Sequence, residues 1–373
     1  MKTNSIKQNI QLHLLRYPAM EIGDMLKLIY QSEFGGGHLI ENTQLSYEQI
    51  LEELKDIPSK TDKTCEALSD RICRVYLDGM LSLFPDKNLV AGIVNALFVE
   101  SAALFNGTME GYYEKLDLLL HMIEHKDWPD DYSNNDGKSW ATDYPFSLKY
   151  IADHKNAGSP MLRHSEIYRA AYRPAYRLAL SEFVEYLALF KKIEDMRKEK
   201  ERIIIAIDGK CGSGKSTLAR ILSAVYTCPA IRVDDFFLPG DLRSEERLNA
   251  PGGNVHYERF MEEIIEPLNQ GKINFSHKVF DCHTMAYTDT PKEISFSNIA
   301  VVEGSYSMQP EFREAYDISV FLDTSPDIQK ARIISRGGEM VYEMFESKWI
   351  PMENRYFEHF NISGNCDIVF KAI

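Results

Sequence analysis

The sequence predicts a mostly α-helical domain over residues 1–199, followed by an α/β domain with a doubly wound parallel sheet over residues 200–373. Three observations lead to this prediction. The chain has 373 residues, more than one hydrophobic core usually holds. Up to about residue 200, apolar residues recur every three or four positions, the period of amphipathic helices. After residue 200, short β-branched runs alternate with helical stretches, which is typical of a parallel sheet.

The first half contains few runs that read as strands. Its last helical pattern covers residues 181–199 and ends in the charged run KKIEDMRKEKER at 191–202. A charged run of this kind is a solvated helix end, and we place the domain boundary there.

The second half begins with the apolar run Ile203–Ile207, which predicts a buried parallel strand. A glycine-rich loop follows and opens a helix over 216–226; another helix is expected at 256–269. Further strands are predicted at 230–233, 278–281, 299–302, 318–322 and 367–371.

The composition is that of a globular protein with an acidic surface. The chain has 42 Lys and Arg against 56 Asp and Glu, for a net charge of −14. Such a surface disfavours non-specific binding to nucleic acids or anionic membranes. The first residues lack a signal-peptide core, no apolar run reaches the ~18 residues of a membrane span, and the six cysteines form no framework. We therefore expect a cytoplasmic protein with reduced cysteines.

The most specific motif is GKCGSGKS at residues 209–216, which fits the phosphate-binding loop pattern G-x-x-x-x-G-K-[ST]. The strand-like IIIAID precedes it and the helix-like STLARIL follows, as the motif requires. Its glycines allow positive φ and bring the backbone N–H groups close to an anion. The motif predicts a site for ATP with these residues: Gly209, Gly212, Ser213, Gly214, Lys215, Ser216 and Thr217.

Two residues of this loop have chemistry of their own. The Lys215 ammonium is expected at the β- and γ-phosphates, and the Ser216 hydroxyl is expected to ligate Mg²⁺. ATP and Mg²⁺ are thus the predicted cofactors.

Carboxylates follow two of the predicted strands. Asp234 and Asp235 come after the strand at 230–233, where a carboxylate can accept a hydroxyl proton or hold Mg²⁺ through water. Glu303 follows the strand at 299–302 and resembles a Walker B acid, a second candidate for the metal. The two aspartates could instead cap the next segment. Glu303 could instead be a carboxylate in an exposed loop.

Arg332 and Arg336 lie four residues apart, on one face of the helix expected after the strand at 318–322. Arginines in this position can stabilise the charge on a transferring phosphoryl group, whereas the alternative is a pair of solvated surface side chains.

With these motifs in place, the chain from about Arg202 to Ile373 resembles the uridine kinase, phosphoribulokinase and pantothenate kinase group of P-loop kinases. The resemblance rests on AIDGKCGSGKSTLA, VDDFF, VFDCH, VVEGSY and the arginine segment, in the family's order. It implies that Asp234 is the base that activates the acceptor hydroxyl. It also implies that Lys215 and Ser216 handle ATP·Mg²⁺, and that Arg332 and Arg336 belong to a lid that excludes water.

The sequence departs from uridine kinases on the acceptor side. The stretch over 249–257 has no acid, although the family grips a ribose there with carboxylates. Phe237 stands where the family has Tyr. Asp235, Phe237, Asp281 and His283 are the candidate substrate-binding residues, and a structural role is the alternative for His283. The predicted acceptor is a small polar metabolite other than plain uridine.

Two segments of the first half resemble no family that we identify. Residues 33–38, EFGGGH, fit either a helix end or a close approach of backbone to a ligand. In residues 164–177, a Tyr-Arg pair recurs every four positions, which would align Arg169, Arg173 and Arg177 on a helix despite Pro174. These arginines would either pair with acids on neighbouring helices or bind a phosphate- or carboxylate-bearing ligand.

The sequence as a whole predicts an ATP-dependent kinase that phosphorylates a hydroxyl of a small molecule, with no nucleic-acid or membrane partner and a homo-oligomer as a possible assembly. One alternative is a nucleotide-gated ATPase or switch acting on the helical domain. The other is a bifunctional enzyme with a second activity in its N-terminal half.

Overall fold

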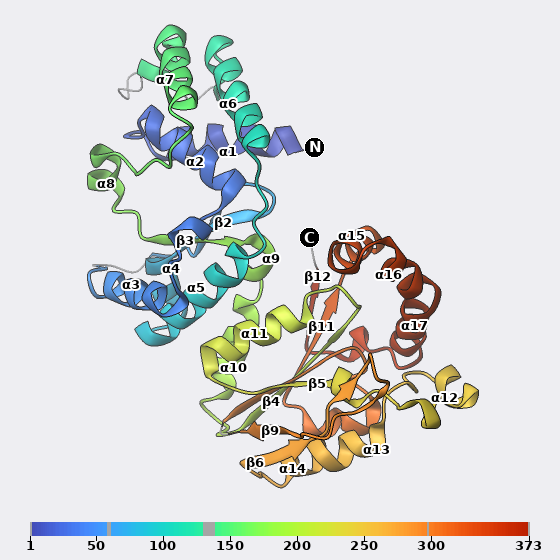
Figure 1. Cartoon of the computed structure of the whole chain (residues 1–373). Helices are drawn as coiled ribbons and strands as arrows, with labels where there is room; N and C mark the ends of the chain where they lie inside the picture. Colours follow the sequence, from blue (N-terminus) through green and yellow to red (C-terminus); the bar gives the residue numbers. More distant parts are fainter. Residues whose placement is uncertain (1, 58–60, 130–138, 297, 372–373) are drawn as a thin grey trace. The chain divides into compact units, whose positions relative to one another are not determined.

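The computed structural model describes residues 2–57, 61–129, 139–296 and 298–371, which form two compact units, Met1–Val184 and Glu185–Ile373 (Figure 1). We call them the N-terminal unit and the C-terminal unit. The division lies upstream of the boundary predicted at 199/200, because α10 (Leu187–Met196) packs within the C-terminal unit. Phe190 of this helix meets the Tyr226 ring at 6.0 Å between centroids, and Lys192 forms a 2.9 Å ion pair with Asp367.

The N-terminal unit contains helices and one small sheet. Its α-helices are α1 Lys2–Arg16, α2 Ile22–Phe34, α3 Thr43–Lys55, α4 Leu77–Leu83, α5 Lys87–Ala102, α6 Met109–Glu124, α7 Tyr144–Asn156, α8 Glu166–Tyr172 and α9 Ser181–Val184. Short 3-10 turns occupy η1 Gly37–Leu39 and η3 Ser139–Ala141. Within the described residues, no helix is both long and apolar enough to cross a membrane.

The N-terminal unit also contains a small sheet that the sequence analysis did not predict. Three antiparallel strands lie in the order β1 Cys65–Ala67, β2 Ile72–Tyr76 and β3 Tyr176–Leu180. The central strand pairs with β3 from Ile72↔Leu180 to Tyr76↔Tyr176. The predicted helix over 181–199 is correspondingly divided into α9, in this unit, and α10, in the other.

The prediction that Arg169, Arg173 and Arg177 align on one helix is wrong, because the helix ends before Arg173. Helix α8 ends at Tyr172, Arg173 has a left-handed backbone with φ of 42°, and Arg177 lies on β3. Pro174 explains the break, because proline disfavours helical backbone in the residue before it and cannot donate a helical hydrogen bond.

The glycines after α2 serve as a helix end. Gly35 caps the helix with φ of 64°, and its N–H donates to the Gln31 carbonyl at 3.0 Å. A Cβ at Gly35 would lie 2.2 Å from the Phe105 ring, so both backbone conformation and packing require glycine.

The C-terminal unit is built on a five-stranded parallel sheet in the order β12-β11-β4-β10-β5. The strands are β4 Ile203–Gly209, β5 Ala230–Arg232, β10 Ile299–Glu303, β11 Ile318–Asp323 and β12 Ile368–Lys371. All seven residues of the central strand β4 are buried. The chain adds strands on both sides of β4, so the predicted parallel α/β P-loop fold is confirmed for this unit.

The helices of this unit include α11 Lys215–Tyr226, α12 Glu245–Asn249, α13 Tyr257–Phe260, α14 Glu266–Asn269, α15 Pro326–Gly337, α16 Glu339–Met344 and α17 Ile350–His359. A π-helical segment (Met261–Ile265) joins α13 to α14, and another (Phe345–Trp349) joins α16 to α17. Short 3-10 turns lie at Val233–Phe236, Gly240–Leu242, Pro310–Ala315 and Ser363–Asn365.

The strand predicted at 278–281 is replaced by two small antiparallel pairs. They are β6 Asn274–His277 with β9 Lys292–Ser295, and β7 Phe280–Asp281 with β8 Ala286–Tyr287. Both pairs are short and largely exposed, so they lack the apolar run that marks a central strand.

The sheet sets the position of the candidate site. Glu303 at the end of β10 is in register with Ile207 of β4 and with Arg232 of β5. The carboxyl ends of these three strands therefore lie at one edge, where the strand order reverses and where ligands bind in open α/β sheets.

Candidate functional site

The glycine loop forms the turn from β4 to α11. Gly209, Gly212 and Gly214 have φ of 143°, 74° and 105°, values that residues other than glycine rarely adopt. The first intrahelical bond of α11 runs from the Leu218 N–H to the Gly214 carbonyl at 3.0 Å. The N–H groups before Leu218 have no partner within the helix and point out of its start. This is the geometry of an anion site.

Lys215 folds back over this loop. Its side chain is nearly buried, and Nζ donates to the carbonyls of Gly209 at 2.7 Å and Lys210 at 3.0 Å, and to Ser305 Oγ at 3.2 Å. The ammonium is thus held at the loop without a carboxylate partner in these contacts, so its charge is available to an anion.

Ser216 and Glu303 meet at the start of α11. The Ser216 hydroxyl donates to Glu303 Oε1 at 3.1 Å, and the Glu303 side chain is buried. Burial, followed by the charge of nearby Asp234, raises the pKa of Glu303. Two oxygen donors at this point form a set that Mg²⁺ accepts, so the residues fit the metal.

Arg232 brings Asp234 and Glu303 together. Its Nη2 lies 3.3 Å from Asp234 Oδ2, and its Nε lies 3.7 Å from Glu303 Oε1. One guanidinium therefore spans both carboxylates. The Asp234 side chain is 45% exposed, so it can be reached by a second molecule at the edge of the phosphate site.

Asp235, the neighbour of Asp234, points to a different place. It is buried, and its Oδ2 lies 3.1 Å from His277 Nε2 and 3.4 Å from Lys292 Nζ. Burial raises its pKa, but the contact with His277 and the charge of Lys292 outweigh burial and lower it. These contacts tie Asp235 to strands β6 and β9, in place of the substrate contact expected from the sequence.

Asp208, the residue before the glycine loop, joins three segments. Its carboxylate is fully buried and accepts N–H groups from Gly209 at 2.7 Å, Tyr306 at 3.2 Å and Met308 at 3.0 Å. The buried Tyr356 hydroxyl of α17 donates to it at 2.8 Å. Burial raises the pKa of Asp208 to about 6, against these hydrogen bonds. The loop, the segment after β10 and α17 therefore share one acceptor.

A second link runs from α17 to the loop through Glu353. The Cys211 N–H donates to Glu353 Oε2 at 2.9 Å, and the Ser305 hydroxyl lies 2.7 Å from Glu353 Oε1. Because Glu353 and Tyr356 lie three residues apart on α17, one helix face fastens the base of the glycine loop.

The two predicted lid arginines differ in position. Arg332 Nη1 lies 3.3 Å from the Gly212 carbonyl and 3.4 Å from the Ser213 carbonyl, so it rests against the loop. Arg336 is exposed, one turn further along α15.

Asp281 and His283, which the sequence predicted to bind the substrate, lie in the β7–β8 pair and its turn. Asp281 accepts the His283 N–H at 2.8 Å, and His283 lies in the exposed turn of this pair. Strand β7 contacts the 3-10 turn at Val233–Phe236, which contains Asp234. Phe237 is half-buried, and its ring meets the Phe280 ring edge-on at 6.2 Å.

The three predicted arginines of the N-terminal unit do not converge. Arg169 and Arg173 are exposed on and after α8, and Arg177 on β3 forms a 2.7 Å ion pair with Glu53 of α3. The alternative interpretation, pairing with an acid on a neighbouring helix, holds for Arg177.

Sequence reasoning missed four residues of the site: Asp208, Arg232, Ser305 and Glu353. Asp208 and Arg232 each stand beside a recognised motif, so their position next to it was an available signal. Ser305 follows the Walker B-like acid by two residues. Glu353 lies in an amphipathic helix and had no such signal.

No protein-family model and no curated protein matches this sequence. A possible uridine kinase from Bacillus stearothermophilus is similar over 49% of this chain and 99% of its own, at 21% identity and a TM-score of 0.36. A shikimate kinase from Bacteroides thetaiotaomicron is similar over 46% of this chain and 86% of its own, at 18% identity and a TM-score of 0.23.

Proposed function

We propose that the C-terminal unit is an ATP-dependent kinase that transfers a phosphoryl group to a hydroxyl of a small polar metabolite. The observation that carries this proposal is the position of Asp234, joined to Glu303 through one guanidinium while Glu303 accepts the Ser216 hydroxyl. A partly exposed carboxylate thus lies beside a phosphate loop, where an acceptor hydroxyl would have to be deprotonated.

The proposed ATP site uses the loop backbone and Lys215. The N–H groups at the start of α11 bind phosphate oxygens, and the Lys215 ammonium exchanges its loop carbonyls for the β- and γ-phosphates. Bound Mg²⁺ would be held by Ser216 with Glu303 behind it, and would neutralise charge on the phosphates.

Transfer then follows from this arrangement. The acceptor oxygen forms a bond to the γ-phosphorus while the bond from that phosphorus to the β–γ bridging oxygen breaks, leaving ADP. Asp234 takes the hydroxyl proton. Arg332, which rests against the loop carbonyls, is placed to reach the transferring group, and Arg336 follows it on the same helix face.

The acceptor is proposed to differ from plain uridine. Residues 249–257 pair with the segment that follows Asp234, since Leu238 N–H donates to the Asn254 carbonyl at 3.0 Å and His256 N–H to the Phe236 carbonyl at 2.8 Å. This stretch therefore borders the acceptor side but has no carboxylate to grip a ribose diol. A polar acceptor with fewer vicinal hydroxyls fits it better.

The test is acceptor-dependent release of ADP. The full chain is incubated with ATP and Mg²⁺, alone and with pools of nucleosides, sugars and vitamin precursors, and phosphorylated products are identified by mass spectrometry. We expect ADP release to require one pool and to vanish in Lys215→Ala. Steady release in buffer alone, unchanged by every pool, would contradict a kinase and support a nucleotide-driven switch.

A further inference from the structure

The N-terminal unit contains a cavity of about 480 Å³ that the proposed kinase does not use. It is lined by the end of α2, the turn from β1 to β2, the loop before α6 and the first turns of α6, with single residues from α1 and β3. Small-molecule sites in proteins have volumes of about 300–1,000 Å³. The cavity therefore has room for a small ligand.

Apolar side chains form one part of the lining. Ile6, Ile72 and Leu180 are buried. Phe105 and Leu118 are half-buried and pack against the hydrophobic core of the unit. The apolar part of a ligand would leave water for this surface, which favours binding.

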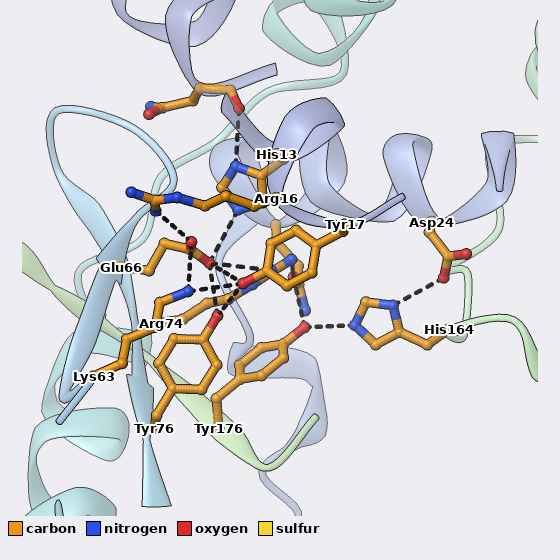
Figure 2. A network of polar contacts seen from close by, with 12 residues as sticks. His13, Arg16, Tyr17, Asp24, Lys63, Glu66, Arg74, Tyr76, His164 and Tyr176 are labelled. Carbon is orange, nitrogen blue, oxygen red and sulfur yellow. Dashed lines mark hydrogen bonds and ion pairs between the residues drawn. The ribbon is translucent and has the colours of Figure 1, made fainter. Parts of the chain in front are cut away.

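The network of polar contacts in Figure 2 joins the elements that line the cavity. The buried Glu66 carboxylate of β1 accepts Arg16 Nη1 of α1 at 2.9 Å. Gln31 Oε1 of α2 accepts Arg74 Nη2 of β2 at 3.3 Å and the Tyr176 hydroxyl of β3 at 3.1 Å. Because β1 also pairs with β2, these contacts tie five elements together. The cavity is therefore largely preformed, which lowers the cost of ordering its walls around a ligand.

Glu33 of α2 and Lys115 of α6 form an ion pair in the lining. Their side chains are 16% and 20% exposed, and 2.8 Å separates Glu33 Oε2 from Lys115 Nζ. The Thr108 N–H donates to Glu33 Oε1 at 2.9 Å. A Cβ at Gly107 would lie 2.2 Å from the Glu33 carbonyl oxygen, so glycine allows the loop before α6 to approach the end of α2. The sequence segment that begins at Glu33 thus contributes a carboxylate to this cavity.

The donors of this ion pair are already used, whereas its acceptors are not. An ammonium has three N–H groups, and Lys115 Nζ has three partners: Glu33 Oε2, the Ser32 carbonyl at 3.0 Å and Ser32 Oγ at 3.1 Å. A carboxylate can accept about four hydrogen bonds, and each oxygen of Glu33 has one partner in these contacts. The pair can therefore accept N–H groups from a ligand.

The charged residues of the lining carry one negative charge in excess. Three are acidic and two are basic: Glu33, Asp70 and Glu114 against Arg71 and Lys115. Asp70, Arg71 and Glu114 are exposed. Arg71 Nη1 donates to Asn106 Oδ1 at 3.3 Å, and Asn106 also lines the cavity. The lining thus favours a cation over an anion.

We propose that this cavity binds a small molecule with an apolar body and one ammonium group. The apolar side chains take the body, and the Glu33 carboxylate accepts N–H groups from the ammonium. The exposed carboxylates of Asp70 and Glu114 attract the same positive charge. The site lies within the N-terminal unit and does not depend on the proposed kinase reaction.

The test is titration of the full chain with hexylammonium, monitored by nuclear magnetic resonance of the ligand. Hexanol and hexanoate carry the same apolar body with a neutral and a negative head group, and butylammonium is two methylenes shorter. The variants are Glu33→Gln and Glu114→Gln. Glu110→Gln is the matched control, because Glu110 is exposed on the same helix but outside the lining. Circular dichroism checks folding, and the exposed Glu114 supplies the test if Glu33→Gln does not fold.

We expect hexylammonium to bind about 10- to 20-fold more tightly than butylammonium, since each buried methylene strengthens binding about fourfold. Hexanol and hexanoate should each bind at least about tenfold more weakly than hexylammonium. Glu33→Gln should weaken hexylammonium about tenfold and leave hexanol unchanged. Glu114→Gln should weaken hexylammonium about two- to fivefold, as expected for an exposed charge, and Glu110→Gln should match the wild type.

Three results would overturn the proposal. Hexanoate binding as tightly as hexylammonium would show that a cation of the lining selects the ligand. Equal affinities for butylammonium and hexylammonium would show that no apolar body is buried. Unchanged affinity in both Glu33→Gln and Glu114→Gln, or equal losses in Glu110→Gln and Glu114→Gln, would show that the amine binds elsewhere on the acidic surface.

Discussion

Asp234 and Asp235 are adjacent in the chain, but their side chains have different surroundings, and Asp→Asn substitutions test the different roles that we propose for them. In Asp234→Asn, the side chain keeps its shape but can no longer take a proton. The Asp234 side chain is 45% exposed and its ion pair with Arg232 spans 3.3 Å, so the loss of this pair costs the fold about 1 kcal/mol or less. The effect on turnover should be much larger. A positioned general base contributes roughly 10²- to 10⁴-fold, so kcat should fall by that factor, which corresponds to about 3–5 kcal/mol in the barrier.

Asp235→Asn is the matched comparison. Asp235 is buried against His277 at 3.1 Å and Lys292 at 3.4 Å, and the amide would leave these groups with a weaker partner. We expect a loss of about 1–3 kcal/mol in the free energy of unfolding and a smaller loss of kcat than in Asp234→Asn.

Three measurements decide between these outcomes. Coupled ADP release gives kcat, titration calorimetry gives the affinity for ATP·Mg²⁺, and urea denaturation gives the free energy of unfolding. Asp234→Asn should retain the wild-type ATP affinity and lose about 1 kcal/mol or less of its free energy of unfolding. If it instead lost ATP affinity in parallel with kcat, Asp234 would be a metal-binding or structural group. If Asp235→Asn lost more turnover while folded, the assignment of the base would be wrong.

Two further predictions concern other parts of the C-terminal unit. Glu303→Gln should raise the Mg²⁺ concentration for half-maximal turnover by about 10- to 100-fold, because Glu303 orients the Ser216 hydroxyl; an unchanged Mg²⁺ requirement would contradict this role. Tyr356→Phe should lower the free energy of unfolding by about 1.5–3 kcal/mol in urea, with an unchanged m-value, because it removes a buried 2.8 Å hydrogen bond to Asp208.

The glycine loop could be predicted from the sequence because its chemistry is contiguous. Eight successive residues carry the backbone conformation, the ammonium and the hydroxyl, and the strand before them and the helix after them each have a clear pattern. Glu303 was predictable for a related reason. It ends an apolar strand, and parallel strands bring their carboxyl ends to the same edge.

The supports of the loop could not be predicted in this way. Asp208 and Tyr356 are separated by 148 positions, and nothing in the local pattern of either residue indicates the other. The surroundings of Asp235 could not be predicted from its local sequence either. Its motif predicts a carboxylate at a strand end, but only the packing of His277 against it turns the side chain inward.

In the N-terminal unit, strands of three to five residues are too short to show a period of two, so helical periodicity dominated the prediction. The Tyr-Arg repeat would align its arginines only on one continuous helix, and the segment instead passes from α8 into β3. Pro174 was the contrary signal, and it proved decisive at Arg173.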